Sequence, residues 1–428
     1  MDTLRKLIRK TRIDFKMSQD DLVKGIKGLS QSTFSRFEKG HIPLDDLHVQ
    51  QLLDKLKIDR SKIPDLVQEI EHQERVSFFS LRALETMIRK GIFDRDKFLE
   101  LSSFIPNENA ILYAKAKRHY VKNELDKAKK KYLKIVDSNE DGQFLNENLV
   151  TGAYLNLSAI AYRQNDLALG FRYCDTGLEN FDPDGERRYL RYSLIYNKAL
   201  FYFKLGDIDR AEKTLEPAWK DRMLINDDMR TRIQVYSLKA SIKRERLLHD
   251  ESINILNKAV DLAAINDLTD MSFELSIELA KHCYENKHYQ LSETCFKSAL
   301  LFREDLDNPN DASVFIEIAR LYFTTERYRQ SEIEVQKAIT AAEQHNDMYK
   351  LTRALMVKGE IDTRIGAISC PRSHFKEALQ LAQEYGFNQL EHEILTRLIQ
   401  LDPFPEQQTD FAIQRELLEA QMRGGEVI

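Results

Sequence analysis

A cluster of hydrogen-bonding side chains lies near the N-terminus, on either side of Phe34 and Phe37. In a helix that begins near residue 31, the two phenylalanines face inward and leave the polar side chains on outward or flanking positions. A glutamine amide can pair bidentately with adenine, whereas Ser, Thr, Arg and Lys suit base edges or phosphates. Gln19 lies at the start of an earlier expected helix, where a phosphate would bind. The expected DNA-contacting side chains are therefore Gln19, Gln31, Ser32, Thr33, Ser35, Arg36 and Lys39.

A second set of polar side chains recurs at intervals of about 40 residues after residue 150. Asn156 and Asn197 occupy the same position in adjacent repeats, and an Asn amide can pair with an extended peptide backbone without reading its sequence. Arg and Lys can bind a carboxylate, and aromatic side chains can form apolar pockets. Taken singly, each polar residue is also what any inner helix face carries, and each Tyr or Phe could simply pack between repeats. The expected peptide-lining side chains are Asn156, Tyr162, Tyr196, Asn197, Gln234, Arg244, Glu278, Lys281, Glu317 and Arg320, with Phe203, Tyr284 and Phe323 beside them.

No constellation of catalytic or metal-binding residues stands out. Glu391-His392-Glu393 lacks the second His of a zinc-binding helix, and no glycine-rich phosphate loop occurs. The four cysteines are scattered without a C-x-x-C pair, which favours buried thiols in a reducing compartment. We predict no enzymatic activity, no cofactor and no metal.

The elements that position the first set form a small head, residues 1–60. Ser18 with Asp21 is a variant of the capping box, and Ser30 is placed to cap the next helix. Gly40, followed by Pro43, should end that helix. Residues 61–107 repeat nothing else in the chain and are predicted to form a connector of two or three helices.

The remainder, residues 108–428, is predicted to be a repeat domain of about seven helical hairpins plus C-terminal capping helices over 388–401 and 408–422. A small residue recurs on each first helix and another on each second helix, where successive spacings are 39 to 42 residues. Small residues let paired helices approach closely, and stacking the hairpins completes a core. The markers of the first helices are Ala116, Ser158, Ala199, Ala240, Ala280, Ala319 and Gly359, and those of the second are Ile135, Gly177, Ala218, Ala259, Ala299, Ala338 and Ala378.

Composition agrees with an all-α chain, because 15 Gly and 9 Pro in 428 residues are about half the usual shares. We expect that few of the turns need a special backbone conformation. Residues 1–60 hold 13 Lys and Arg against 9 Asp and Glu, a net +4, whereas the rest carries a net −9. This split favours an anionic partner for the head. The sequence has no apolar signal core and no membrane-spanning stretch, so we expect a cytoplasmic protein without a membrane partner.

The head resembles the helix-turn-helix domain of the Cro/C1-repressor class. The matching residues are Arg12, residues 18–23 (Ser-Gln-Asp-Asp-Leu-Val), residues 35–40 (Ser-Arg-Phe-Glu-Lys-Gly) and Pro43. Val23 replaces the usual Ala, and the segment from Gly25 to Leu29 is one residue longer than usual. The resemblance implies an internal ion pair between Arg12 and Glu38 and, for a dimer, a pseudo-palindromic operator with half-sites about 10 bp apart.

The body resembles tetratricopeptide repeats, best matched by residues 202–207 (Tyr-Phe-Lys-Leu-Gly-Asp) followed by Ala211. The expected fold is therefore a helix-turn-helix domain followed by a right-handed α-solenoid whose first helices line a concave groove. Head, connector and long repeats together resemble the RRNPP family of peptide quorum-sensing regulators, either its NprR-like branch or the arbitrium-type phage regulators.

That resemblance implies a cytosolic transcriptional regulator, a homodimer or tetramer, whose binding to double-stranded DNA is switched by a short signalling peptide. It also assigns the backbone-clamping role to Asn156 and Asn197. Two alternatives stay open: a repeat scaffold that acts through protein contacts, and a modulator that dephosphorylates a response regulator through a connector glutamine. Gln68 and Gln73 lie in the region for that second role.

Overall fold

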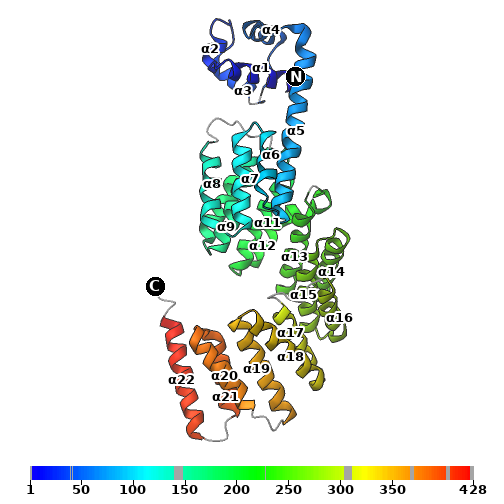
Figure 1. Ribbon diagram of the computed structural model, residues 1–428, viewed down its shortest axis with the longest axis vertical. Coiled ribbons are helices and arrows are strands. Elements are labelled where there is room, and N and C mark those ends of the chain that lie inside the picture. Colours follow the sequence, from blue (N-terminus) through cyan, green and yellow to red (C-terminus); the bar gives the residue numbers. More distant parts are fainter. Residues whose placement is uncertain are drawn as a thin grey trace. The chain divides into compact units, whose positions relative to one another are not determined.

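The computed structural model describes residues 2–38, 40, 42–138, 148–226, 228–302, 311–366, 371–401 and 405–424. Within these ranges all regular structure is helical and no strand occurs, so the all-α prediction is confirmed. The chain divides into two compact units, Met1–Thr231 (unit 1) and Arg232–Ile428 (unit 2). Figure 1 shows the order of the helices along the chain.

Unit 1 opens with four short helices, which form the head. They are α1 (Asp2–Asp14), α2 (Gln19–Val23), α3 (Gln31–Glu38) and α4 (Asp46–Lys55). Ile8, Leu22, Phe34 and Leu52 are each fully buried in one apolar cluster that joins all four helices. The predicted capping box of Ser18 and Asp21 starts α2. The head thus has a hydrophobic core of its own.

A single 27-residue helix, α5 (Ile63–Arg89), leads from the head to the repeats. Its N-terminal half packs against α1, and its C-terminal half packs against α6 (Arg95–Ser103) and α7 (Glu108–Val121). Leu81, Leu84 and Ile88 of α5 share a hydrophobic cluster with residues of the first two hairpins. The predicted connector therefore contains two α-helices; the proposed division at residues 60 and 107 stays a prediction.

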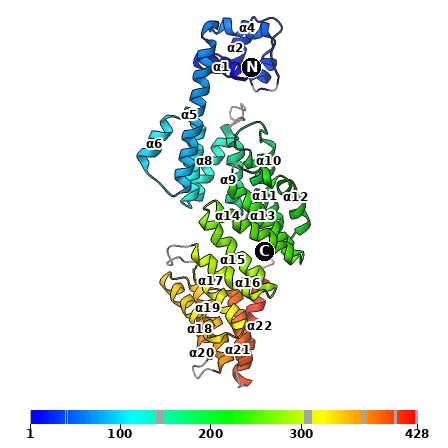
Figure 2. The same cartoon turned by 90° about the vertical axis from the view of Figure 1, so that its right-hand side faces the viewer.

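The remaining helices pair as antiparallel hairpins, visible in both views of the chain (Figures 1 and 2). In unit 1, α7 pairs with α8, α9 with α10, and α11 with α12. Their bounds are α8 (Leu125–Asp137), α9 (Leu149–Arg163), α10 (Leu167–Glu179), α11 (Tyr189–Lys204) and α12 (Ile208–Lys220). α13 (Met229–Glu245) begins at the boundary, and unit 2 continues with α14 (His249–Ile265), α15 (Thr269–Glu285), α16 (Tyr289–Leu301), α17 (Asp311–Thr324), α18 (Tyr328–Gln344), α19 (Met348–Ile365), α20 (Pro371–Tyr385), α21 (Asn388–Leu401) and α22 (Pro405–Gly424).

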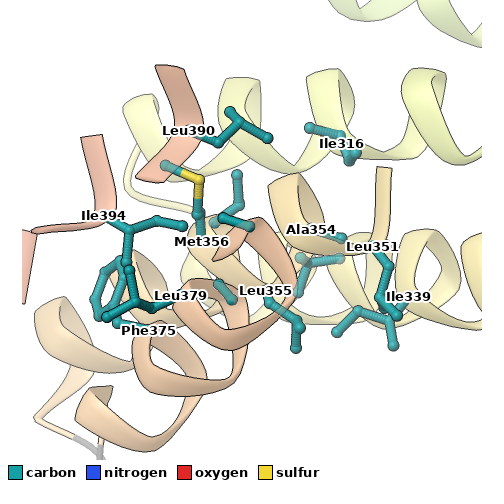
Figure 3. Close-up of a cluster of buried hydrophobic side chains, with 14 of the residues drawn as sticks. Ile316, Ile339, Leu351, Ala354, Leu355, Met356, Phe375, Leu379, Leu390 and Ile394 are labelled. Atoms are coloured by element: carbon teal, nitrogen blue, oxygen red, sulfur yellow. The ribbon is translucent and has the colours of Figure 1, made fainter. Parts of the chain in front are cut away.

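The small residues predicted from the repeat are buried where hairpin helices meet. All seven first-helix markers and all seven second-helix markers are buried. A Cβ on Gly359 would lie 2.7 Å from Cε2 of Phe375, which shows how closely α19 and α20 approach. In unit 2 these contacts continue into a large apolar cluster (Figure 3), where Leu355 and Met356 of α19 meet Phe375 and Leu379 of α20 and Ile394 of α21.

The turns between paired helices contradict the expectation that few of them need a special backbone conformation. In each of the seven hairpins from α7–α8 to α19–α20, the residue seven positions after the first-helix marker has a positive φ, between 58° and 76°. Two of these residues are glycine and five carry side chains, although a left-handed residue costs an L-amino acid about 1–2 kcal/mol. The prediction was wrong because hairpin geometry, rather than residue type, imposes this conformation. The seven are Asn123, Asn165, Gly206, Leu247, Lys287, Glu326 and Gly366.

Candidate functional site

Helix α3 presents the predicted polar side chains on the outside of the head. Phe34 and Phe37 are 0% and 3% exposed, as their inward orientation predicted. Gln31, Ser32 and Arg36 are exposed, whereas Thr33 and Ser35 are half-buried. The Ser30 hydroxyl accepts a hydrogen bond from the Thr33 amide at 3.1 Å and so caps the helix as expected.

A chain of hydrogen bonds fixes the start of α3 against α1 and α2. Arg12 binds Glu38 bidentately, Nε to Oε1 at 2.7 Å and an amino nitrogen to Oε2 at 3.0 Å, which confirms the predicted internal ion pair. Arg12 also donates to the Met17 carbonyl. Glu38 accepts from Gln19 Nε2 at 2.6 Å, and Gln19 Oε1 accepts from Gln31 Nε2 at 2.9 Å.

These hydrogen bonds change the expected role of Gln19. Its amide group lies half-buried between Glu38 and Gln31, where it orients the first side chain of α3. Direct contact of Gln19 with a phosphate stays a prediction. Lys39, the last residue of the predicted DNA-contacting set, lies outside the described residues.

The turn between α2 and α3 is held from α4. Gly25 and Gly28 have φ values of 87° and 88°, so both depend on the absence of a side chain. Lys55 Nζ donates to the Asp21 carbonyl at 2.8 Å, and a ring nitrogen of His48 lies 3.2 Å from the Lys27 carbonyl oxygen. Helix α4 therefore contacts the chain just before the lengthened segment, at Lys24, and within it, at Lys27.

In unit 1 the two predicted clamp residues lie on successive first helices, α9 and α11; we call Asn156 and Asn197 the amide row. Asn156 Nδ2 donates to the Gly152 carbonyl at 2.7 Å and reaches the Tyr113 hydroxyl at 3.4 Å. Asn197 Nδ2 donates to the Ser158 hydroxyl at 2.8 Å. Both side chains are half-buried. The structure thus orients each amide through its nitrogen, by contacts with its own helix or with the preceding repeat.

The aromatic residues predicted beside the amide row pack between repeats. The Tyr162 ring stacks on Phe201 of the next hairpin, with centroids 5.8 Å apart, and Lys204 Nζ lies 4.7 Å from the Tyr162 ring centroid. Tyr196 and Phe203 are half-buried. Tyr162 therefore has a packing role in addition to any contact with a ligand.

In two hairpins of unit 2 the position of the amide row is occupied by a carboxylate. Like Asn156 and Asn197, Glu278 and Glu317 stand two residues before the small marker of their helix; we call them the carboxylate row. Glu278 accepts from the Ser241 hydroxyl at 2.9 Å and the Ser237 hydroxyl at 3.1 Å. Burial raises the pKa of Glu278, and the two hydroxyl groups oppose that rise.

Glu317 lies between cations of the two neighbouring first helices. A guanidinium nitrogen of Arg353 is 3.2 Å from Glu317 Oε1, and Lys281 Nζ is 3.9 Å from the same oxygen. Sequence reasoning missed Ser237, Ser241 and Arg353. Their signal was present, because each lies about one repeat away from the carboxylate that it contacts.

The other predicted residues of unit 2 are scattered among these contacts. Gln234, Arg244 and Arg320 are half-buried, and Arg244 lies 3.1 Å from the carboxylate of Glu245. The Tyr284 hydroxyl is 2.7 Å from the Thr324 hydroxyl, and the Phe323 ring packs 5.9 Å from that of Tyr328. Arg244 also acts on the carboxylate row, because its positive charge opposes the rise in the pKa of Glu278.

Other chemistry is not assembled in the part of the chain that the structure describes. There, no group of three or more His, Cys, Asp or Glu side chains is placed to hold a metal ion. No helix among the described residues is long and apolar enough to cross a membrane. Gln73 accepts from Lys10 Nζ at 2.9 Å and donates to Glu69, whereas Gln68 is exposed on α5.

The hairpins and their buried small residues define an all-α protein of the tetratricopeptide-repeat class. No protein-family model matches the sequence, and the comparison with curated proteins finds no match. Among solved structures, the apo form of RapI aligns with a TM-score of 0.60 at 11% identity, over 82% of this chain and 99% of that one. A Rap protein complexed with competence and sporulation factor aligns with a TM-score of 0.51 at 15% identity, again over 82% and 99%.

A third solved structure shows how widely this architecture is used. A signal-transduction ATPase of the STAND class with a tetratricopeptide repeat sensor, from Pyrococcus horikoshii, aligns with a TM-score of 0.58 at 14% identity, over 99% of this chain and 64% of that one. Rap proteins belong to the RRNPP family. The predicted resemblance to that family is therefore confirmed at the level of the fold.

Proposed function

We propose that the chain is a transcriptional regulator whose head binds a pseudo-palindromic operator as a dimer or tetramer, under the control of a short signalling peptide bound along the first helices of the repeats. The proposal rests above all on helix α3. Its exposed Gln31, Ser32 and Arg36 are carried on a buried Phe34–Phe37 face and anchored through Gln19 and Glu38. A recognition helix needs this combination of rigid support and free polar side chains.

Peptide binding is supported by the rows of oriented polar groups. In the amide row each nitrogen is held by the protein, which leaves the amide oxygen as the group for a peptide N–H. The carboxylate row, together with Lys281 and Arg353 beside Glu317, adds charged groups of both signs that suit peptide side chains. The Rap protein complexed with competence and sporulation factor supports the view that this fold can hold a signalling factor.

Helix α5 offers the route by which the repeats would influence the head. Lys6 Nζ of α1 lies 2.9 Å from a carboxylate oxygen of Glu74, and Lys10 donates to Gln73 one residue earlier. Three to four turns further along α5, Glu85 pairs with Lys117 of α7 at 3.3 Å. A peptide that shifts α7 therefore acts on the same rigid helix that contacts the head.

DNA binding is tested with the full chain and a library of double-stranded oligonucleotides, from which bound sequences are selected. We expect enrichment of a two-fold-symmetric site and an affinity that falls steeply as salt is raised. The double variant Gln31→Ala, Arg36→Ala should lose the selected site and keep the native circular dichroism spectrum. Arg60→Ala, an exposed arginine of the head outside α2 and α3, is the matched control. Unchanged affinity in the double variant would rule out α3 as the reading helix.

Peptide control is tested by titrating the DNA-bound chain with synthetic candidates, first those encoded by a short secreted propeptide gene next to its own. We expect one peptide to change the operator affinity. Asn156→Ala and Asn197→Ala should weaken that response, whereas Lys213→Ala, at an exposed lysine of α12 outside the predicted lining, should preserve it. A response that survives loss of both asparagines would argue against the amide row.

The competing role as a modulator of a response regulator is supported by the Rap fold and by the exposed Gln68 on α5. Incubation with a phosphorylated response regulator separates the two. Loss of phosphate that disappears in Gln68→Ala would favour the modulator, and persistence of the phosphate would remove it.

A further inference from the structure

A small polar cavity lies in unit 1, between the C-terminal half of α5 and the segments that precede α11 and α13. Its volume is about 190 Å³. Five of its nine lining residues belong to α5. None of the peptide-lining or DNA-contacting residues predicted from the sequence is among them, so the cavity is separate from both surfaces discussed above.

One wall of the cavity is fixed by a buried cluster of charges. Glu85 of α5 is 6% exposed and lies 3.3 Å from Lys117 Nζ and 3.7 Å from a guanidinium nitrogen of Arg187. Burial works to raise the pKa of Glu85, but the two cations together hold it below its usual value. The carboxylate is therefore ionised, and it holds the Arg187 side chain in place at the cavity wall.

Arg187 is held in an unusual backbone conformation. Its φ is 56°, in the left-handed region that a side chain makes costly, and Arg187 is nevertheless buried. Asn148 keeps the preceding loop in position, because its Nδ2 donates to the Glu186 carbonyl at 2.7 Å and to the Asp182 carbonyl at 3.0 Å. The loop thus presents Arg187 to the cavity at an energetic cost that side-chain contacts must offset.

Two further arginines, Arg82 and Arg89, line the cavity from α5. They stand seven residues apart, two helical turns along one face. Arg82 lies over the Phe78 ring, 5.5 Å from its centroid. Among the described residues, neither guanidinium has a carboxylate within 4.0 Å. Both are exposed, so they can move toward a ligand without breaking an ion pair.

The lining also contains acidic groups besides Glu85. They are Glu186, which is exposed, and Asp228, which accepts a hydrogen bond from the Thr231 hydroxyl at 2.9 Å. A simple anion would leave these two carboxylates unmatched, and a simple cation would leave the two arginines unmatched. A ligand that pairs with both sets carries a carboxylate and an ammonium group.

We propose that this cavity binds a free α-amino acid, with its carboxylate on Arg82 and Arg89 and its ammonium group toward Asp228 and Glu186. A longer peptide does not suit this charge pattern, because its two charged ends lie farther apart than those of a single amino acid. The binding site is independent of the proposed peptide and DNA functions, so either can fail without the other.

The test is calorimetric titration of the full chain with each of the twenty amino acids, and with acetate and inorganic phosphate. We expect at least one amino acid to bind and neither anion to match it. The double variant Arg82→Gln, Arg89→Gln should lower its affinity at least tenfold. Arg75→Gln, one heptad earlier on α5 and outside the lining, is the matched control and should bind like the unaltered chain.

Two analogues of the binding amino acid complete the test. Its N-acetyl form imitates the C-terminal end of a peptide, and its amide imitates the N-terminal end. Loss of binding for both supports a site for the free zwitterion. Retained binding of either analogue, equal affinity for acetate or phosphate, no amino acid binding at all, or full affinity in the double variant would each overturn the proposal.

Discussion

The hairpins of unit 1 and those of unit 2 use the same repeat positions for different chemistry. Two residues before the first-helix marker, two hairpins of unit 1 have the amides Asn156 and Asn197, whereas two hairpins of unit 2 have the carboxylates Glu278 and Glu317. The amides make neutral hydrogen bonds, and Glu317 makes ion pairs. Repeats with one backbone plan have thus diverged into a row suited to a peptide backbone and a row suited to charged side chains.

A second difference lies twelve residues after the marker, where each hairpin closes. In unit 2, Ser292 donates its hydroxyl to the Ala280 carbonyl at 2.8 Å, and Ser331 and Ser252 repeat this contact in their own hairpins. In unit 1 the equivalent residue of α10 is Gly170, whose missing side chain leaves space for the Phe201 ring. The α9–α10 hairpin of unit 1 therefore closes by aromatic packing against the next hairpin, and three hairpins of unit 2 close by a hydrogen bond between their own two helices.

The largest effect is expected when the serine that closes hairpins of unit 2 is introduced at the equivalent position of unit 1, Gly170. A Cβ on Gly170 would lie 2.7 Å from Phe201 Cε2, and that ring is 1% exposed. We expect Gly170→Ser to destabilise the chain by about 2–3 kcal/mol, as overpacking does. The midpoint of urea unfolding measures it. Ala211→Ser, at the same position of the next hairpin where a Cβ already exists, should change stability far less; equal effects would remove the packing argument.

A smaller effect is expected in the two rows. Glu317→Gln removes one charge from between Arg353 and Lys281 and should cost about 1–2 kcal/mol at low salt. Asn197→Ala removes a neutral bond to the buried Ser158 and should cost about 1 kcal/mol. In about 1 M salt, where charges are screened within about 3 Å, the cost of Glu317→Gln should shrink and that of Asn197→Ala should not. Parallel salt responses would contradict the distinction between the rows.

The sequence was a good guide wherever one local pattern decides the structure. The inward faces of Phe34 and Phe37, the caps at Ser18 and Ser30, and the buried markers of the repeat all follow from helical periodicity and the size of side chains. The Arg12–Glu38 ion pair was expected from the Cro/C1 resemblance instead, because 26 residues separate the partners.

The sequence was a poor guide where contacts join side chains of different helices. Gln19 could be placed at a helix start, but its bonds to Glu38 and Gln31 depend on how three helices pack. Arg353 reaches Glu317 from 36 residues away, and only the stacking of first helices brings the two together. The α5 cavity was missed for the same reason, since its lining is drawn from segments more than 90 residues apart.

The hydrogen bond that closes three hairpins of unit 2 should have a modest effect. Ser292→Ala deletes the hydroxyl that satisfies the Ala280 carbonyl and should lower the free energy of unfolding by about 1 kcal/mol. Ser331→Ala should repeat the result, because its bond to the Ala319 carbonyl has nearly the same length. As a control, Thr294→Ala removes an exposed hydroxyl from the same helix as Ser292. A loss for Thr294→Ala as large as for Ser292→Ala would show that the closing bond has no special weight.

The smallest effect compares one turn from each unit and is expected to have opposite signs in the two. The turn residue of α11–α12 is Gly206, and that of α15–α16 is Lys287, with φ values of 76° and 62°. Since a side chain is strained there, Lys287→Gly should stabilise the chain by about 0.5–1 kcal/mol, even after the greater unfolded-state entropy of glycine. Gly206→Ala should destabilise it by a similar amount, although no atom would meet the new Cβ within 4 Å. Thermal unfolding of both variants measures the difference. Destabilisation by Lys287→Gly would mean that chain entropy outweighs left-handed strain in this hairpin, and that side-chain turns are then no burden to unit 2.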